Sequence, residues 1–292
     1  RRFGMNYTAG HIFPASGCAG AVAHALRVVT KPGDKVLVQA PFFPEYIPYI
    51  NDTGAQIEII PARFEDFQIN FEALEQMLQP GVAAILINSP NNPSGVAYTG
   101  ETLEKLSSLL AAKSKELGYN LFLISDEPYR EIAFGGREIP YPARFYPHTL
   151  TCYSFSKSLS VPGERIGYVA VCPECEHAED IVPMCGQISR GIGHNCPSSL
   201  IQLAAAEAVD DTADLSVYET NMELLYETFR ELGFEVKKPD GTFYIMPKAL
   251  EEDAGRRRSM TLFLSPVMHF MRPAISGSLT ALIRRRSDAR CR

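Results

Sequence analysis

The chain has no tryptophan, no hydrophobic run long enough to cross a membrane, and no cysteine pattern typical of a disulfide framework. Its 292 residues are 46% apolar and 21% charged, as in ordinary globular proteins, and no run approaches the roughly 18 apolar residues of a membrane span. Seven scattered cysteines do not indicate disulfide pairing in a chain of this length. The first residues also lack the apolar core of a signal peptide. These absences predict a cytoplasmic protein without a membrane partner.

Lysine is missing from the C-terminal stretch. Residues 255–292 contain nine arginines, no lysine and a single acid, Asp288. Residues 1–254 contain 19 basic and 33 acidic residues, a net charge of −14, which argues against a nucleic-acid partner. We expect residues 255–292 to be an atypical tail: the product of a shifted reading frame, a divergent basic extension, or a disordered segment.

Metal-ligand patterns are also scarce. Cys172 and Cys175 have the spacing of a zinc knuckle, but the sequence has no second cysteine pair or histidine pair that could supply the other two zinc ligands. We therefore expect no metal site, and we interpret this segment as a surface turn between two elements.

Short β-rich runs alternate with helical patterns, which favours an α/β fold with a mostly parallel sheet covered on both faces. The expected strands are 35–39, 56–60, 83–88, 121–125, 150–155 and 167–172. The expected helices between and after them are 19–30, 70–77, 101–117 and 198–209. A longer amphipathic helix at 214–232 and a strand at 241–246 indicate a second, smaller unit.

A lysine directly follows one expected strand, in the segment 153–157 (Tyr-Ser-Phe-Ser-Lys). A half-buried Lys157 can lose its proton and form a Schiff base. Ser154 supplies a hydroxyl and Arg165 a guanidinium, and both groups suit a phosphate. A single lysine at a strand end is usually a solvated surface residue. The combination with Pro-Gly-Glu-Arg-Ile-Gly at 162–167, at this spacing, is a much more specific pattern than a single lysine.

Other polar residues follow neighbouring strands, where open α/β sheets bind their ligands. Asp126 follows one strand and precedes Glu-Pro-Tyr129; the simpler alternative is that Asp126 caps a helix. Asn92 lies in a Pro/Asn/Gly segment at 89–95, which is also typical of a plain turn.

Two more segments complete the pattern. A helix that opens at Gly17, Cys18 and Ala19 presents unpaired backbone N–H groups to an anion. Phe43 supplies an aromatic ring after a further strand, a position where packing in the core is the usual role.

Together these five segments resemble the fold type I pyridoxal-phosphate enzymes, specifically the class I/II aminotransferases of the aspartate aminotransferase type. The resemblance covers residues 1–254 and includes the order of the segments and the interval from Lys157 to Arg165. It implies a three-layer large domain with an incomplete smaller α+β domain, and pyridoxal 5′-phosphate as cofactor. It also implies an amino acid and a 2-oxo acid as substrates, amino-acid metabolism or biosynthesis as the context, and a homodimer in full-length relatives.

The same resemblance implies a role for each site residue. Lys157 would hold the cofactor as a Schiff base and then move the substrate's proton. Asp126 would pair with the pyridine nitrogen and keep it protonated, which makes the ring an electron sink. Tyr129 and Asn92 would hydrogen-bond the phenolate oxygen, and Phe43 would stack on the ring. The phosphate would be bound by Ser154, Arg165 and the backbone amides of Gly17, Cys18 and Ala19, with Cys18 and Ala19 contributing no side-chain donor.

The resemblance also divides the chain. Residues 1–8 are expected to be a remnant of the small domain, 9–213 the cofactor-binding large domain, and 214–254 the interdomain helix and the start of the small domain. Family members carry a further N-terminal segment and a C-terminal arginine that binds the substrate carboxylate. Residues 255–292 do not match that C-terminal pattern, so we expect little amino transfer from the chain as written.

Two other functions stay open at this stage. A C–S lyase would use the same cofactor residues and would release pyruvate and ammonia without an oxo-acid acceptor. A non-catalytic or regulatory protein would bind the cofactor without turnover.

Overall fold

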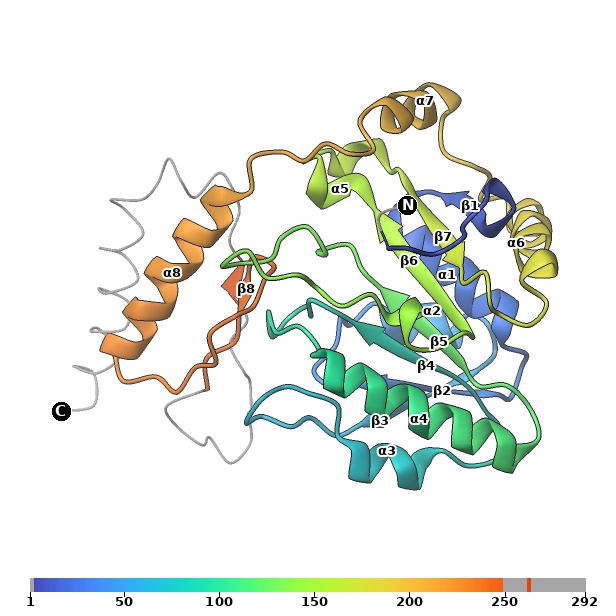
Figure 1. Ribbon diagram of the computed structural model, residues 1–292, viewed down its shortest axis with the longest axis horizontal. Coiled ribbons are helices and arrows are strands. Elements are labelled where there is room, and N and C mark those ends of the chain that lie inside the picture. The colour runs from blue at the N-terminus through green and yellow to red at the C-terminus, as the bar shows by residue number, and fades with distance from the viewer. Residues whose placement is uncertain (1–2, 249–261, 264–292) are drawn as a thin grey trace.

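The computed structural model describes residues 3–248 and the backbone of residues 262–263. Its centre is a seven-stranded sheet of order β1-β7-β6-β5-β4-β2-β3 (Figure 1). The strands are β1 (Ile12–Ala15), β2 (Lys35–Gln39), β3 (Gln56–Ile60), β4 (Val82–Asn88), β5 (Phe122–Asp126), β6 (Thr149–Ser154) and β7 (Gly167–Val171). Strands β2 to β6 are parallel, whereas β7 is antiparallel to β6 and β1 is antiparallel to β7. The predicted α/β fold with a mostly parallel sheet is confirmed.

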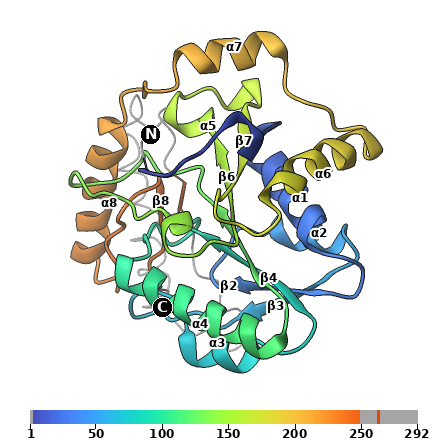
Figure 2. The same cartoon turned by 45° about the vertical axis from the view of Figure 1, so that its right-hand side comes forward.

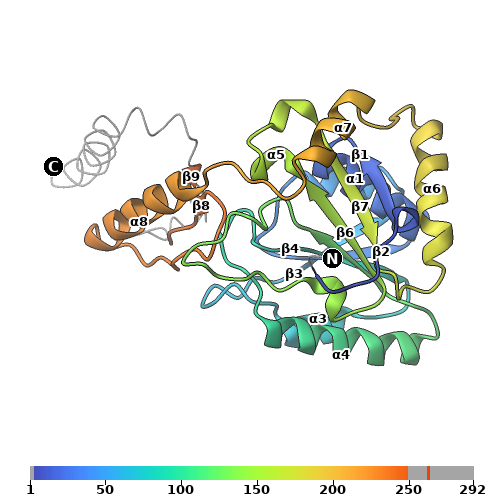
Figure 3. The ribbon, with the colours of Figure 1, turned by 45° about the horizontal axis from the view of Figure 1, so that its top comes forward.

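Helices cover both faces of this sheet (Figure 3). The described residues form the helices α1 (Gly17–Val29), α2 (Tyr46–Asn51), α3 (Phe71–Met77), α4 (Gly100–Leu117), α5 (Phe155–Ser158), α6 (Ala178–Gly191), α7 (Ser199–Glu207) and α8 (Ser216–Glu231). Helices α1, α2 and α6 cover one face of the sheet, and α3 and α4 cover the other. Successive side chains of a strand point to opposite faces. Val36 and Val38 of β2 therefore join the core under α1, α2 and α6, while Leu37 joins the core under α3 and α4.

The sequence predicts α4 because its signals are local. Thr99 caps the helix by accepting a hydrogen bond from the backbone N–H of Thr102 at 3.1 Å. Gly118 ends the helix in the left-handed conformation, with φ of 77°. Leu103, Leu106 and Leu110 form its buried stripe.

The sequence analysis missed β1 and three helices. The edge strand β1 contains Pro14, which a strand tolerates only at an edge. Pro48 lies in α2 and Pro183 lies inside α6, so these two helices lack the usual sequence signal. The predicted surface turn is present between β7 and α6, with Glu174 and Glu176 exposed. The thiols of Cys172 and Cys175, however, point inward and are buried in the core with Ile181.

The chain after α7 forms a second group of elements. Helix α8, β8 (Tyr244–Ile245) and β9 (Leu262–Phe263) lie beside the sheet rather than on it (Figures 1 and 3). Met222, Leu225, Phe229 and Ile245 form a separate core there. Strand β9 falls within the stretch expected to be an atypical tail, and the rest of residues 255–292 lies outside the described residues.

Two further observations bear on the predicted domains and partners. Phe3, Met5 and Tyr7, expected in a small-domain remnant, pack against the core of the large sheet. Helix α7 lies at the periphery of the molecule (Figure 2) and leaves Leu200 and Leu203 exposed. Within the described residues, no helix combines the length and the apolar character of a membrane span.

Candidate active site

A pocket lies at the carboxyl ends of the parallel strands, and nine of the ten predicted site residues line it. They are Cys18, Ala19, Phe43, Asn92, Asp126, Tyr129, Ser154, Lys157 and Arg165. The tenth, Gly17, is the first residue of α1 and lies against the Arg165 guanidinium. The fold therefore brings together residues that are spread over about 150 positions of the sequence, at the edge where open α/β sheets bind ligands.

Lys157 lies in α5, the short helix that begins as β6 ends. The Ser154 hydroxyl caps this helix by accepting a hydrogen bond from the Ser156 backbone N–H at 3.1 Å. The lysine side chain is half-buried, and its Nζ lies 5.1 Å from the centre of the Phe243 ring. Burial lowers the pKa of Lys157, and the positive charge of Arg165 lowers it further. Both effects favour the neutral amine, the form that reacts with an aldehyde.

Asp126 is the last residue of β5 and is only 6% exposed. Cys18 donates its thiol to Oδ1 at 2.6 Å, and the Tyr46 hydroxyl donates to Oδ2. Burial raises the pKa of Asp126 to about 6, while these two hydrogen bonds act in the opposite direction. The sequence analysis assigned the Cys18 side chain no contact with the phosphate, and it did not foresee that the thiol contacts the Asp126 carboxylate.

Asn88, which the sequence analysis did not single out, connects two of the predicted residues. Its Nδ2 donates to the backbone carbonyl of Asp126 at 2.8 Å, and its Oδ1 accepts from the backbone N–H of Asn92 at 2.6 Å. The sequence did offer a signal for Asn88, because it is an amide at the end of a buried strand. The nitrogen and the oxygen of a buried amide both need hydrogen-bond partners.

The first turn of α1 and Arg165 form the other end of the pocket. Ser16 precedes α1 and makes no side-chain capping bond within the described part of the chain, so the first N–H groups of the helix lack that partner. Cys18 and Ala19 of this first turn line the pocket. Arg165 adopts a left-handed conformation with φ of 51°, which costs a non-glycine residue energy. This conformation directs its guanidinium back toward the Ser16 carbonyl, with Nη2 at 3.4 Å.

Gly17 is required at this corner of the pocket for two reasons. Its φ is +72°, in the left-handed region. A Cβ at this position would also lie 2.5 Å from Nη2 of Arg165. The helix terminus and the guanidinium can approach this closely only because residue 17 has no side chain, and together they present an electropositive surface suited to an anion.

Aromatic side chains line the remaining walls. Phe43 packs edge-on against Tyr46, with ring centres 5.7 Å apart. The hydroxyls of Tyr129 and Tyr244 lie 3.1 Å apart, and burial raises the pKa of Tyr129. Tyr46 and Tyr244 were missed by the sequence analysis, since tyrosines in apolar surroundings give no signal that distinguishes a site from a core.

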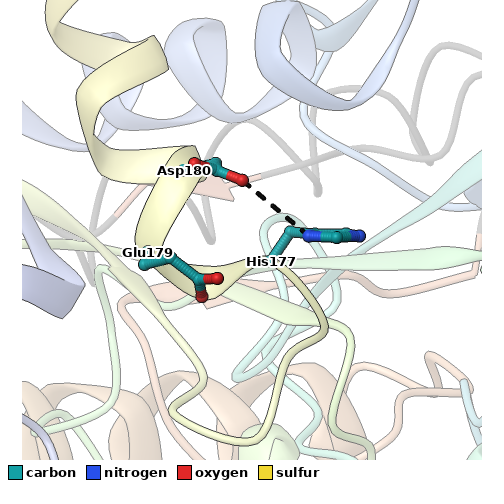
Figure 4. A group of neighbouring side chains, drawn as sticks. All are labelled: His177, Glu179 and Asp180. Atoms are coloured by element: carbon teal, nitrogen blue, oxygen red, sulfur yellow. Dashed lines mark ion pairs between the residues drawn. The ribbon is translucent and has the colours of Figure 1, made fainter.

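One group of potential metal ligands lies outside this pocket, at the start of α6 (Figure 4). It consists of His177, Glu179 and Asp180, all exposed. His177 Nδ1 lies 3.8 Å from Asp180, and its Nε2 lies 3.7 Å from Glu176. These ion pairs account for the geometry, and the three side chains lack the buried orienting partners of a metal centre.

Residues 3–263 match the family of class I and II aminotransferases. The chain is 30% identical over 270 residues to a probable N-acetyl-LL-diaminopimelate aminotransferase of Bacillus subtilis, covering 86% of this chain and 65% of that protein. It is 29% identical over 277 residues to a probable aspartate/prephenate aminotransferase of Aquifex aeolicus, covering 89% of this chain and 66% of that protein. The chain thus spans about two thirds of the length of these relatives.

Solved structures agree with this match. An amino transferase of Eubacterium rectale is 42% identical, with a TM-score of 0.85, and the superposition covers 87% of this chain and 64% of that one. The aspartate aminotransferase of Thermotoga maritima is 27% identical, with a TM-score of 0.76 and coverage of 87% and 66%. The chain therefore belongs to the class I and II aminotransferase family, whose members depend on pyridoxal phosphate.

Proposed function

We propose that this chain binds pyridoxal 5′-phosphate in the pocket and is part of an enzyme that moves an amino group between an amino acid and a 2-oxo acid. One observation carries the proposal: a half-buried Lys157 with a lowered pKa shares its pocket with a buried carboxylate and with an anion-binding helix terminus. The relatives' names include aspartate, prephenate and aromatic amino acids. The proposal therefore covers amino acids and 2-oxo acids in general and does not select one of these substrates.

The residues present fit both ends of this cofactor. At one end, the first turn of α1, Arg165 and the serine hydroxyls of Ser154 and Ser156 suit a phosphate. At the other end, the buried Asp126 suits a protonated ring nitrogen, because a cation beside it would offset the cost of burying its charge. Phe43 supplies a face for the ring.

The protein's own residues then have distinct tasks. When bound, the cofactor supplies an aldehyde and a ring that withdraws electrons. Lys157 would hold the cofactor through its side-chain amine, and the same amine would accept and return the proton at the substrate's Cα. Tyr129 and Asn92 also line the pocket, and their hydroxyl and amide groups would donate to the ring oxygen.

The proposal is tested by trapping the cofactor. Pyridoxal phosphate followed by borohydride is expected to label Lys157 covalently, and Lys157→Ala is expected to abolish both the yellow colour and the label. Lys115→Ala, at an exposed lysine of α4, serves as the matched control, and this variant is expected to be labelled on Lys157 like the wild type. An adduct on Lys113 or Lys115 in the wild-type chain would overturn the assignment.

The reaction type is tested separately, with a panel of amino acids. Transamination requires an added oxo acid such as 2-oxoglutarate, and it converts one amino acid into another. Release of pyruvate and ammonia without an acceptor would favour the C–S lyase instead. Binding without either reaction would favour a non-catalytic protein.

We further propose that the complete protein is a homodimer that uses the face of α7. Leu200 and Leu203 are 72% and 69% exposed, and Val209 beyond the helix is 54% exposed; adjacent exposed apolar side chains are typical of an interface. Sedimentation analysis is expected to show dissociation for Leu200→Glu/Leu203→Glu. Leu224→Glu, at a residue 42% exposed on α8, is expected to leave assembly unchanged.

The expected domain boundaries and cellular location are part of the same proposal. A large domain at 9–213, followed by a smaller unit that begins at 214, agrees with the separate core formed by α8 and β8. The six described cysteines are free, as is usual in a reducing compartment such as the cytoplasm. Cell fractionation tests the location, and limited proteolysis near residue 213 tests the boundary.

A further inference from the structure

We propose that Cys18 and Tyr46 are positioning residues that hold Asp126 as a carboxylate, so that the shared proton stays on the cofactor's ring nitrogen. This inference rests on the proposed function. It adds two residues to the site, one of which has a side chain to which the sequence assigned no task.

The geometry assigns one donor to each oxygen of Asp126. The Cys18 thiol comes from the first turn of α1 and reaches Oδ1, while the Tyr46 phenol comes from α2 and reaches Oδ2. A third element fixes the backbone, since Asn88 of β4 donates to the carbonyl of Asp126 at 2.8 Å. The carboxylate is therefore held from three directions, and it still faces the pocket.

The two donors decide where a shared proton resides. A carboxylate beside a pyridine nitrogen can form either a carboxylate–pyridinium pair or a neutral pair, and the choice depends on the relative basicity of the two groups. Burial pushes Asp126 toward the protonated form, whereas the hydrogen bonds from Cys18 and Tyr46 stabilise the anion. Loss of either donor shifts the proton from the ring toward the carboxyl.

Cys18 is suited to this task because its thiol stays protonated. Burial and the negative charge of Asp126 raise the pKa of Cys18 well above its usual value. The same two causes raise the pKa of Tyr46. Both groups are therefore donors at neutral pH rather than nucleophiles. A serine hydroxyl at position 18 offers the same donor.

The other charged groups near Asp126 leave this balance in place. Glu127, the next residue in the chain, raises the pKa of Asp126 through its charge. Its own carboxylate is paired with Arg130 and accepts a hydrogen bond from Ser125 at 2.7 Å. Cys152, aligned with Asp126 on β6, is buried and has a raised pKa, so it remains neutral.

The first test observes the ring nitrogen directly in the loaded protein, using pyridoxal phosphate labelled with ¹⁵N. Cys18→Ala and Tyr46→Phe are expected to move the nitrogen resonance toward that of unprotonated pyridine. Cys18→Ser, the matched control, is expected to keep the wild-type resonance. A wild-type resonance in Cys18→Ala would overturn the proposal, as would equal shifts in Cys18→Ala and Cys18→Ser, because a packing role alone predicts no rescue by a hydroxyl.

The second test needs no cofactor. In the cofactor-free protein, iodoacetamide is expected to modify the exposed Cys196 quickly and Cys18 slowly. Asp126→Asn removes the charge that helps to raise the thiol pKa, so the rate at Cys18 is expected to rise about tenfold for each unit by which its pKa falls. The rate at Cys196 is expected to stay constant and serves as the internal reference. An unchanged ratio of the two rates would overturn the contact between Cys18 and Asp126.

The two tests separate this inference from the proposed function. If Lys157 fails to trap pyridoxal phosphate, the proposed function fails, while the alkylation rates still report on Cys18 and Asp126. If trapping succeeds and the nitrogen resonance is the same in Cys18→Ala as in the wild type, the proposed cofactor site is supported and the inference about Cys18 is wrong.

Discussion

The hydroxyl of Tyr129, after β5, lies 3.1 Å from the hydroxyl of Tyr244 on β8. Both rings belong to one buried cluster with Ile132 and Tyr218, against which Phe243 packs. Tyr129 borders the predicted cofactor site on the large sheet, whereas Tyr244 belongs to the second group of elements around α8. This contact therefore joins the smaller unit to a residue of the pocket.

The first prediction concerns this tyrosine pair. With cofactor bound, Tyr129 donates to the ring oxygen in our proposal, and a hydrogen bond from Tyr244 strengthens that donation. Tyr244→Phe is expected to raise the midpoint of the cofactor's absorbance titration by up to about 0.7 pH units, since one hydrogen bond contributes about 1 kcal/mol. Tyr226→Phe, in α8 and outside the pocket lining, is the control and is expected to give the wild-type midpoint.

The second prediction concerns affinity for the phosphate. Arg165→Ala removes a charge-assisted hydrogen bond, and the dissociation constant for pyridoxal phosphate is expected to rise about ten- to a hundredfold. Arg144→Ala, at another exposed arginine on the 3-10 helix Pro142–Arg144, is expected to leave it unchanged. Fluorescence quenching on cofactor addition measures both. Equal affinities for the two variants would show that Arg165 does not contact the phosphate.

The third prediction separates backbone strain from crowding at the pocket. Gly17 and Gly118 have nearly equal φ values of +72° and +77°, but a Cβ at Gly17 meets Arg165 while no described atom lies within 4 Å of a Cβ at Gly118. Either Gly→Ala change is expected to destabilise the protein by about 1 kcal/mol. Only Gly17→Ala is expected to weaken cofactor binding as well. Loss of binding in both variants would trace the effect to general destabilisation.

The large sheet could be predicted from the sequence because its signals are local. Strands β2 and β3 were predicted with the bounds that the structure has, since short β-rich runs between turn residues indicate strands. Helix α6 was missed because Pro183 obscures its pattern, and α5 because four residues are too few to show a period.

The predicted site residues came from their positions at strand ends, and the structure gathers them in one pocket. The roles of those residues remain proposals. What the sequence could not provide were contacts between distant segments, such as Cys18 with Asp126 or Tyr129 with Tyr244, which are 108 and 115 residues apart. Such pairs depend on the tertiary fold, and a single sequence carries no local pattern for them.

The fourth prediction concerns the buried ion pair directly after Asp126. Glu127 and Arg130 are 1% and 5% exposed, and the Arg130 guanidinium lies 4.6 Å from the centre of the Phe3 ring. Arg130→Met leaves the Glu127 carboxylate buried without its cation, so the free energy of unfolding is expected to fall by about 3–5 kcal/mol. The double variant Glu127→Leu/Arg130→Met is expected to lose less. Urea denaturation measures both, and an equal or larger loss in the double variant would contradict the explanation by an unpaired charge.

The last prediction follows from the pKa of Asp126. Burial raises this pKa from 3.8 to about 6 in the folded protein, so the folded state binds a proton more tightly than the unfolded state. The carboxyl is neutral in both states below about pH 4, and the folded state loses stability as the pH rises through about 6. In the cofactor-free protein this loss amounts to about 3 kcal/mol.

Asp126→Asn is expected to abolish that pH dependence. The measured quantity is the free energy of unfolding of the variant minus that of the wild type. For Asp126→Asn this difference is expected to rise between about pH 4 and pH 7 and then to level off. For the control Asp210→Asn, at an exposed aspartate, the difference is expected to stay the same at every pH. Saturating pyridoxal phosphate is expected to reverse the order at neutral pH, because the ring cation then compensates the Asp126 charge in the wild type and the asparagine provides no such pairing. A difference that stays flat with pH would show that Asp126 carries no burial cost, and burial could then no longer explain why this carboxylate prefers a cation beside it.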